Sequence, residues 1–352
     1  FPMADTNAEV AARAAYGTGV PGAVNLLPAT GMEADLAAVE NELRAAVTTA
    51  DELLTQAAGH LLLAGGKRLR PALACAAGRL LAPHAPASSD VVLGGAAVEL
   101  VHVGSLYHDD VMDDAGTRHG VQSVNSRWGN LVAILAGDFL LAKASEIAAG
   151  LGTEVSALLA ATIGRLCEGQ VAELQSTFNP ARTEDAYFRS IEGKTASLMS
   201  ASCRIGALAA GHDRTTVEAL TTYGLHLGLT FQIVDDLLDV VSTDAELGKP
   251  AGHDVIEGSY HLPVLRFIAG GGRSDILGRA VTTEETAEFL AELRASDAVA
   301  STLATARECA DRATQELKAI DAPASEVSGA LANLPARLCD DVEARAHGIG
   351  AL

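Results

Sequence analysis

The sequence predicts an all-α protein, and three observations lead to this fold class. Ala and Leu dominate the apolar residues, and both favour helices. Aromatic residues, which favour strands, make up only 4% of the chain. Apolar residues recur at the three- and four-residue spacing of one helical face, as at Leu36, Val39, Leu43 and Val47. With 352 residues, 49% of them hydrophobic, the chain can bury a substantial core.

The expected helices follow one another along the chain, separated by breaks rich in Gly, Pro, Asn or Asp. The first begins at Met32, and the others are expected at 51–63, 71–81, 90–114, 128–149, 153–175, 184–210, 215–242, 260–269, 284–295 and 300–319. Scattered Gly, Pro and Thr indicate a loose N-terminal arm over residues 1–30, in which Phe1-Pro2 is interpreted as an expression scar. Because neither a polar linker nor an internal repeat interrupts the remainder, residues 31–352 are predicted to form a single domain.

The charge balance and the cysteines restrict the function classes. A formal net charge of −20 argues against a nucleic-acid partner, because no large cationic field is available to attract phosphates. The five cysteines are widely spaced and odd in number, so we expect buried free thiols in a cytoplasmic protein. No signal peptide and no uncharged apolar run of membrane-spanning length is evident, so no transmembrane segment is expected.

Two acidic clusters of identical spacing carry the main chemical signal, DDVMD at 109–113 and DDLLD at 235–239. In a helix, positions i and i+4 share a face, so the carboxylates of each cluster would lie side by side. Burying them unpaired would cost several kcal/mol, whereas Mg²⁺ neutralises carboxylates and binds phosphate oxygens at the same time. Two such faces opposed across a bundle would hold a metal cluster and a diphosphate. The alternative is a pair of solvated acidic helix faces. Because the same spacing occurs twice, each time within an apolar helix, the metal site is favoured over this alternative.

Isolated cations lie near these clusters. In GGKRLRP at 65–71 the glycines let the backbone approach an anion, and Lys67 and Arg70 could clamp it. Three further cations follow the clusters or lie in a helical stretch: Arg118, Lys194 and Lys249. Each could equally belong to an ordinary surface ion pair. His102, two helical turns before the first cluster, would by itself be interpreted as a core residue.

Taken in order, these motifs resemble the trans-isoprenyl diphosphate synthases, or polyprenyl synthetases, and especially their longer-chain members. The series is GGKRLRP at 65–71, ELVH at 99–102, LYHDDVMDD at 106–114, WGN at 128–130, LAGDFLLA at 135–142, EGQ at 168–170, GKT at 193–195, FQIVDDLLD at 231–239 and GKPAGHD at 248–254. It covers roughly residues 53–263.

The resemblance implies an isoprenoid synthase fold, which is a bundle of antiparallel helices around a deep central cavity, and usually a homodimer. It implies that an allylic diphosphate is ionised and joined to isopentenyl diphosphate. Roughly three Mg²⁺ ions per site would be held by Asp109, Asp110, Asp113, Asp235, Asp236 and Asp239. The allylic diphosphate would be bound by Arg118, Lys194 and Lys249, with Thr195 and Gln232 beside them. The diphosphate of isopentenyl diphosphate would be bound by Lys67, Arg70 and His102.

Two positions depart from the family pattern. The loop after the first cluster commonly reads Arg-Arg-Gly, but here His119 replaces the second arginine, which is usually assigned to isopentenyl diphosphate. A neutral imidazole binds phosphate less strongly than a guanidinium group unless the site raises its pKa. The stretch that commonly reads EGK-x-T-L-P is EGSYHLP at 257–263, so Ser259 replaces the lysine.

Product length is expected to depend on Gly104 and Ser105, one helical turn before Asp109. No large aromatic side chain blocks the expected cavity there, so we predict a product of geranylgeranyl length or longer. Two other classes stay open, a terpene cyclase on the same fold and a non-catalytic subunit of a heteromer. The first would ionise a prenyl diphosphate without adding isopentenyl diphosphate.

Overall fold

The computed structural model describes residues 23–243 and 251–352, and in these residues the expected all-α fold class is confirmed. The only described strands are β1 (Thr117–Arg118) and β2 (Val121–Gln122), which form one antiparallel pair. Most of the expected N-terminal arm lies outside the described residues. Its last part contains a short helix, α2 (Ala23–Leu26), and buries Leu26 and Leu27.

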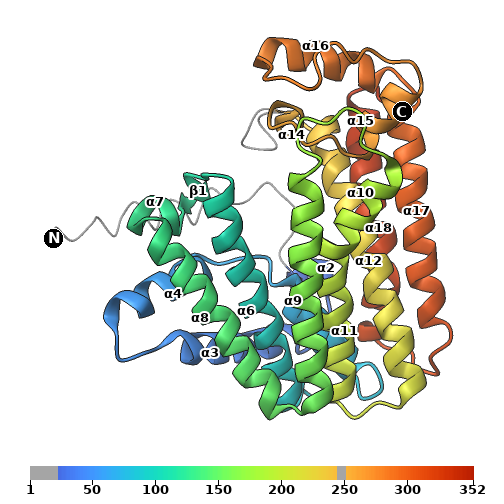
Figure 1. Ribbon diagram of the computed structural model, residues 1–352. Coiled ribbons are helices and arrows are strands. Elements are labelled where there is room, and N and C mark those ends of the chain that lie inside the picture. Colours follow the sequence, from blue (N-terminus) through green and yellow to red (C-terminus); the bar gives the residue numbers. More distant parts are fainter. Residues whose placement is uncertain (1–22, 244–250) are drawn as a thin grey trace. The chain divides into compact units, whose positions relative to one another are not determined.

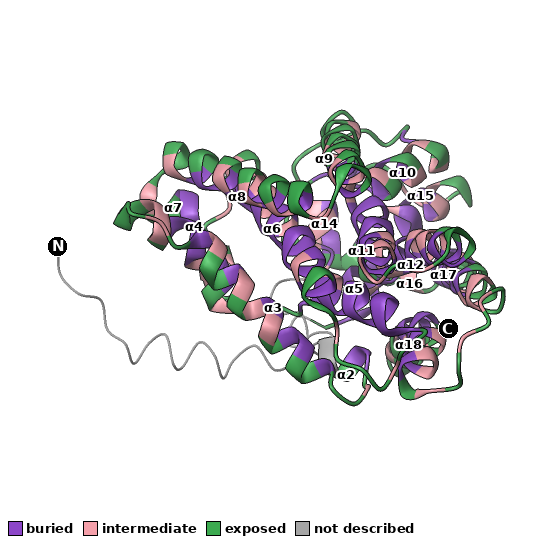
Figure 2. Ribbon diagram, turned by 90° about the horizontal axis from the view of Figure 1, so that it is seen from below, coloured by how far each residue is buried: buried purple, intermediate pink, exposed green. Residues whose placement is uncertain are grey.

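The helices gather into two compact units. The first contains the described residues up to Ala160, together with Ile205–His212 and Ser325–Val327. Its remaining helices are α3 (Met32–Val47), α4 (Glu52–Ala64), α5 (Leu69–Arg79), α6 (Ser89–Met112), α7 (Val124–Trp128) and α8 (Asn130–Gly150). Helix α6 packs along α8, and α5 is buried over most of its length (Figures 1 and 2).

The second unit contains Ala161–Arg204, the described part of Asp213–Ala324, and Ser328–Leu352. Its elements lie wholly or mostly in these ranges: α9 (Thr153–Leu174), α10 (Glu184–Ile191), the π-helix η1 (Glu192–Ala196), α11 (Ser197–Ala209), α12 (Arg214–Val241), α14 (His253–Ile256), α15 (Leu262–Ala269), α16 (Thr283–Arg294), α17 (Ala298–Leu317) and α18 (Glu326–Gly348). Helix α12 packs extensively against α17 (Figure 1).

Side-chain caps explain where the two longest helices begin. The Ser88 hydroxyl accepts a hydrogen bond from the backbone N–H of Val91 at the start of α6. The Asp213 carboxylate accepts one from the backbone N–H of Thr216 at the start of α12. Such caps satisfy N–H groups that have no partner inside the helix and stabilise it by about 1 kcal/mol. Both helices then run uninterrupted to the acidic clusters at their C-terminal ends.

Among the described helices, α6 alone is long and apolar enough to cross a bilayer, and 67% of its apolar window is buried. A helix that is apolar on all sides and buried is typical of a protein core. All five cysteines are free, as expected, and four of them are buried. The expectation of burial is wrong for Cys167, because this position of α9 faces solvent.

Candidate active site

The first acidic cluster lies at the C-terminal end of α6, in the first unit. Asp113 is the residue that caps the helix, and its backbone N–H donates to the carbonyl oxygen of Asp109 at 2.8 Å. The expected i, i+4 relationship is therefore present in the backbone. The three side chains differ in exposure, because Asp110 is completely buried, Asp109 is half-buried and Asp113 is exposed.

The hairpin of β1 and β2 supplies the charged partner of Asp110. Both Nε and Nη2 of Arg118 lie 2.7 Å from Asp110 Oδ1. Burial raises the pKa of Asp110, and the positive charge of Arg118 opposes that rise. Asn125 fixes the backbone by donating to the carbonyl oxygen of Asp110 at 3.0 Å. The second carboxylate oxygen, Oδ2, is buried and has no hydrogen-bond partner, which suits a bound cation.

The residues that the resemblance implies for isopentenyl diphosphate, Lys67, Arg70 and His102, all lie in the first unit, together with His119. The pKa of His102 is lowered well below its usual value by burial and then by nearby Arg70 and His119. The pKa of His119 is lowered to about 4 by burial and by Arg118, Arg68 and Lys67. The site therefore keeps the His119 imidazole neutral at pH 7 instead of raising its pKa.

One cation of the GGKRLRP segment has a structural role that the sequence did not separate from its neighbours. The Arg68 guanidinium is buried and bonds to Glu40, to Glu99 at 2.9 Å and to the carbonyl oxygen of Leu62 at 2.7 Å. Its backbone is left-handed, with φ of 50°. Lys67 is exposed, so this turn places the Lys67 side chain at the surface and the Arg68 side chain in the interior.

The two candidate chain-length residues lie in different environments. Ser105 is half-buried, and its hydroxyl donates to the carbonyl oxygen of His102 at 2.8 Å. Gly104 is buried, and a Cβ atom built on it would lie 3.2 Å from the carbonyl oxygen of Gly137 in α8. The expected cavity is therefore not found beside Gly104, because the backbone of α8 lies against this position.

The second acidic cluster lies near the C-terminal end of α12, in the second unit. Asp236 and Asp239 are 3% and 5% exposed, whereas Asp235 is exposed. Asp236 Oδ2 accepts a 2.5 Å hydrogen bond from Tyr187 Oη, and Oδ1 accepts one of 2.8 Å from Gln232 Nε2. Burial raises the pKa of Asp236 to about 6. Thr195 extends the chain of contacts by donating to Gln232 Oε1 at 2.7 Å, which links it through Gln232 to Asp236.

Lys194 reaches this site from η1 because two helices approach closely. A Cβ atom on Gly169 of α9 would lie 2.4 Å from the backbone nitrogen of Lys194, which only glycine tolerates. One turn beyond Gly169, Glu173 forms an ion pair with Lys194. Although burial alone would raise the pKa of Glu173, His261 and Lys194 lower it to about 2. These three side chains line a cavity of about 60 Å³. Lys249 lies outside the described residues.

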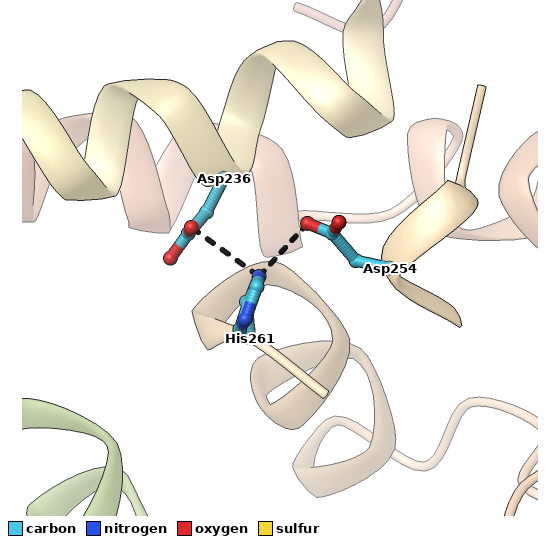
Figure 3. A group of neighbouring side chains, drawn as sticks. All are labelled: Asp236, Asp254 and His261. Carbon is cyan, nitrogen blue, oxygen red and sulfur yellow. Dashed lines mark ion pairs between the residues drawn. The ribbon is translucent and has the colours of Figure 1, made fainter. Parts of the chain in front are cut away.

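His261 and Asp254 are site residues to which the sequence analysis gave no role. Figure 3 shows the His261 ring between Asp236 and Asp254, with Nδ1 lying 3.2 Å from Asp236 Oδ1 and 3.0 Å from Asp254 Oδ2. Both carboxylates outweigh burial and raise the pKa of His261 well above its usual value. The sequence held a signal for each residue. Asp254 ends the motif GKPAGHD, and His261 occupies the threonine position of EGK-x-T-L-P.

The donor set of each cluster fits Mg²⁺, which prefers carboxylate oxygens and shares them with substrate phosphates. Each cluster combines at least one buried carboxylate with others nearer to solvent. Each also has a cation within its own unit, Arg118 in the first and Lys194 in the second.

Comparison with known proteins gives a consistent assignment. Residues 51–293 match the family model described as polyprenyl synthetase. The chain is 37% identical over 304 residues to heptaprenyl diphosphate synthase component 2 of Geobacillus stearothermophilus, an alignment covering 85% of this chain and 93% of the relative. It is also 37% identical over 310 residues to nonaprenyl diphosphate synthase of Mycobacterium tuberculosis, covering 86% and 92%.

Solved structures agree with these relatives. A decaprenyl diphosphate synthase from Rhodobacter capsulatus superposes with a TM-score of 0.82 at 32% identity, covering 91% of this chain and 99% of that one. A polyprenyl synthase from Caulobacter crescentus, solved with calcium and isoprenyl diphosphate, has a TM-score of 0.81 at 34% identity and covers 90% and 96%. The family match spans residues 51–293, and the alignments with the two relatives cover 85% and 86% of the chain. This chain therefore belongs to the polyprenyl synthetase family and is a prenyltransferase.

Proposed function

We propose that this prenyltransferase ionises an allylic diphosphate with the help of Mg²⁺ and joins it to isopentenyl diphosphate. One observation carries the proposal. The same acidic spacing occurs on α6 and α12, and in both clusters the second aspartate is buried and held by a specific donor. That donor is Arg118 for Asp110 and Tyr187 for Asp236. A solvated acidic face would need neither the burial nor the donor.

The six aspartates Asp109, Asp110, Asp113, Asp235, Asp236 and Asp239 would hold the ions, expected to number roughly three. Bound Mg²⁺ would supply neutralisation of the leaving diphosphate. Arg118, Lys194 and Lys249 would bind that diphosphate as the carbon–oxygen bond breaks, because their charge is worth most where negative charge develops. Before substrate binds, Arg118 and Lys194 are engaged with Asp110 and Glu173.

The second substrate would bind to the cation cluster of the first unit. Lys67 and Arg70 would contact the diphosphate of isopentenyl diphosphate, and the neutral rings of His102 and His119 would donate hydrogen bonds to it. The double bond then attacks the allylic carbon, and the released diphosphate accepts the proton that is lost. The protein's own contribution is therefore positioning and electrostatic stabilisation.

We propose a product of geranylgeranyl length or longer. Relatives named heptaprenyl and nonaprenyl diphosphate synthase support a long product, and one named geranylgeranyl diphosphate synthase supports the lower end of that range. We further propose a cytoplasmic homodimer. The free cysteines are compatible with a reducing compartment.

The test is to incubate the purified protein with Mg²⁺, an allylic diphosphate and labelled isopentenyl diphosphate. Label in a longer prenyl chain is the expected result. An unlabelled cyclic hydrocarbon would instead identify a terpene cyclase, and absence of any turnover would identify a non-catalytic subunit. Asp109→Ala and Asp235→Ala should abolish turnover, whereas Asp90→Ala, an exposed acid on α6, should not.

A second measurement tests whether the two clusters act on one diphosphate. Mn²⁺ binding, followed by electron paramagnetic resonance, should strengthen when inorganic diphosphate is added. This strengthening should disappear in Asp109→Ala and also in Asp235→Ala. If one variant keeps the full effect of diphosphate, the two clusters do not share the ligand.

A further inference from the structure

We propose that Asp236, Asp254 and His261 form a mixed nitrogen–oxygen site for a divalent first-row transition-metal ion such as Co²⁺ or Mn²⁺. The site would give the second acidic cluster of this chain a higher affinity for such ions than oxygen ligands alone provide. The inference rests on the proposed function only in taking Asp236 as a metal ligand, and its test requires no turnover.

The geometry around the imidazole suits a bound ion. His261 Nδ1 lies 3.2 Å from Asp236 Oδ1 and 3.0 Å from Asp254 Oδ2, but it forms no hydrogen bond of acceptable geometry with either oxygen. Neighbouring ligands around an ion with ligand distances of about 2.1 Å in octahedral geometry lie about 3.0 Å apart. Both distances match neighbouring ligands of one ion, and the three side chains offer ligand atoms within 4.8 Å of one another. Figure 3 shows the ring nitrogen lying between the two carboxylates.

A carboxylate lies near the other ring nitrogen. His261 Nε2 lies 3.9 Å from Glu173 Oε1. A histidine that binds a metal nearly always directs its second nitrogen at a carboxylate or carbonyl, which fixes the ring and its tautomer. Glu173 is itself held by Lys194. A proton at Nε2 would leave the lone pair of Nδ1 directed toward Asp236 and Asp254.

Neighbouring groups already orient the carboxylates. Tyr187 and Gln232 donate to the two oxygens of Asp236, as the outer contacts of a ligating carboxylate do. The backbone N–H of Asp254 donates to Asp239 Oδ2 at 3.2 Å, which ties the start of α14 to α12. The turn before α14 requires Gly252, whose φ is 71°.

The position of His261 is fixed by the segment before α15. Arg182 Nη1 donates to the carbonyl oxygen of Tyr260 at 3.1 Å, and Tyr260 Oη accepts a 2.7 Å hydrogen bond from the backbone of Gly278. His261 then serves as the N-terminal boundary residue of α15. The ring is therefore placed by one buried contact from Arg182 and one part-buried contact from Gly278.

Ligand chemistry determines which ions the site prefers. Imidazole is a common ligand of divalent first-row transition metals, whereas Mg²⁺ favours oxygen ligands and retains water. Threonine, the residue of the family pattern at this position, offers no nitrogen ligand. His261 should therefore strengthen Mn²⁺ and Co²⁺ binding while changing Mg²⁺ binding little.

A competing interpretation makes the opposite prediction. If the His261 ring only supplies positive charge between carboxylates, it competes with a divalent ion for the same space. Replacing it would then strengthen the binding of every divalent ion. The sign of the change in affinity separates the two interpretations.

The experiment uses the full-length, metal-free protein and its His261→Thr variant, with His253→Thr as a matched control. His253 is also a histidine of the second unit, and it pairs with Glu257 on the surface. Mn²⁺ and Mg²⁺ affinities are measured by paramagnetic resonance and by competition, and bound Mn²⁺ is examined for coupling to a ¹⁴N nucleus. A thermal unfolding scan establishes that each variant is folded.

We expect the Mn²⁺ affinity of His261→Thr to fall at least tenfold, with the ¹⁴N coupling lost and Mg²⁺ affinity changed less than threefold. The His253→Thr variant should match the wild type. No ¹⁴N coupling in the wild type, or an unchanged or increased Mn²⁺ affinity in His261→Thr, would overturn the proposal. If labelled chains still form with Mg²⁺ in that case, the proposed function stands and only this site is wrong. Nitrogen coupling in a protein that forms no labelled chain would support the site and contradict the function.

Discussion

Gly104 of α6 faces the backbone of α8 so closely that a Cβ atom would lie 3.2 Å from the carbonyl oxygen of Gly137. The same Cβ atom would contact Leu140 and Leu141 at 3.4 Å. Gly104→Phe should therefore separate the two helices, and it should lower the free energy of unfolding by about 3 kcal/mol. Chemical denaturation measures this loss.

Ser105 provides the matched test of product length. Its side chain is half-buried and bonds only to its own helix, so Ser105→Phe should retain most of the stability. If the position faces the growing chain, this variant should release shorter products, as measured by mass spectrometry. An unchanged product distribution from a folded Ser105→Phe protein would show that this turn of α6 does not determine the length of the product.

Lys67 and Arg68 are neighbours in sequence, but substitution of Arg68 should lower stability, whereas substitution of Lys67 should weaken substrate binding. Arg68→Ala would leave the buried carboxylate of Glu99 without its ion pair, which typically costs about 3–5 kcal/mol. Lys67 is exposed, so Lys67→Ala should change stability by less than about 0.5 kcal/mol. It should instead raise the KM for isopentenyl diphosphate. Equal destabilisation by the two substitutions would show that the inward and outward assignments are wrong.

The sequence predicted the long helices well because each has a clear apolar period and a break on both sides. It missed α18, although Leu331, Leu334 and Leu338 carry the helical spacing and are buried. The reason is Pro335, which lies inside the helix and normally breaks one. Proline cannot donate to the carbonyl oxygen of Leu331, and Tyr223 Oη of α12 donates to that oxygen at 2.8 Å instead. A contact across 108 positions is not visible in a local pattern.

This compensation gives a double-mutant prediction. Tyr223→Phe should cost about 1–3 kcal/mol, because it leaves the buried carbonyl of Leu331 unpaired. Pro335→Ala restores a backbone N–H that can bond to this carbonyl, so it should recover much of the loss in the Tyr223→Phe background. Denaturation midpoints of the four proteins measure the coupling. Strict additivity of the two substitutions would rule out a shared acceptor.

In the candidate site, too, the sequence predicted what depends on local spacing and missed what depends on packing between distant segments. Spacing alone predicted both acidic clusters, and the resemblance placed Thr195 and Gln232 beside the same diphosphate. In the structure these two side chains share a hydrogen bond. Spacing could not show that Asp110 and Asp236 are the buried members, since burial depends on the packing of other helices. Glu173 and His261 meet only because α9 and the start of α15 approach each other. The sequence on either side of these two residues gives no indication of this contact.

His119→Arg should lower the KM for isopentenyl diphosphate by about tenfold, because a charged hydrogen bond to phosphate is worth more than a neutral one. The structure strengthens this expectation, since the low pKa of His119 leaves the wild-type ring uncharged at pH 7. His84→Arg, at an exposed position of the same unit, controls for the added charge. An unaltered KM in His119→Arg would show that this position does not serve the substrate.

The same histidine should make stability depend on pH. Its folded pKa of about 4 lies below the ordinary value of 6.5, so between these values the unfolded chain binds more protons than the folded protein. Stability therefore falls as the pH is lowered through that window, by about 2 kcal/mol between pH 7 and pH 5 from this group alone. His119→Gln should lose less stability than the wild type over this range, by about that amount, in urea denaturation at both pH values. The exposed His84→Gln should follow the wild type. If His119→Gln also follows it, the imidazole is not held neutral by burial and its cationic neighbours.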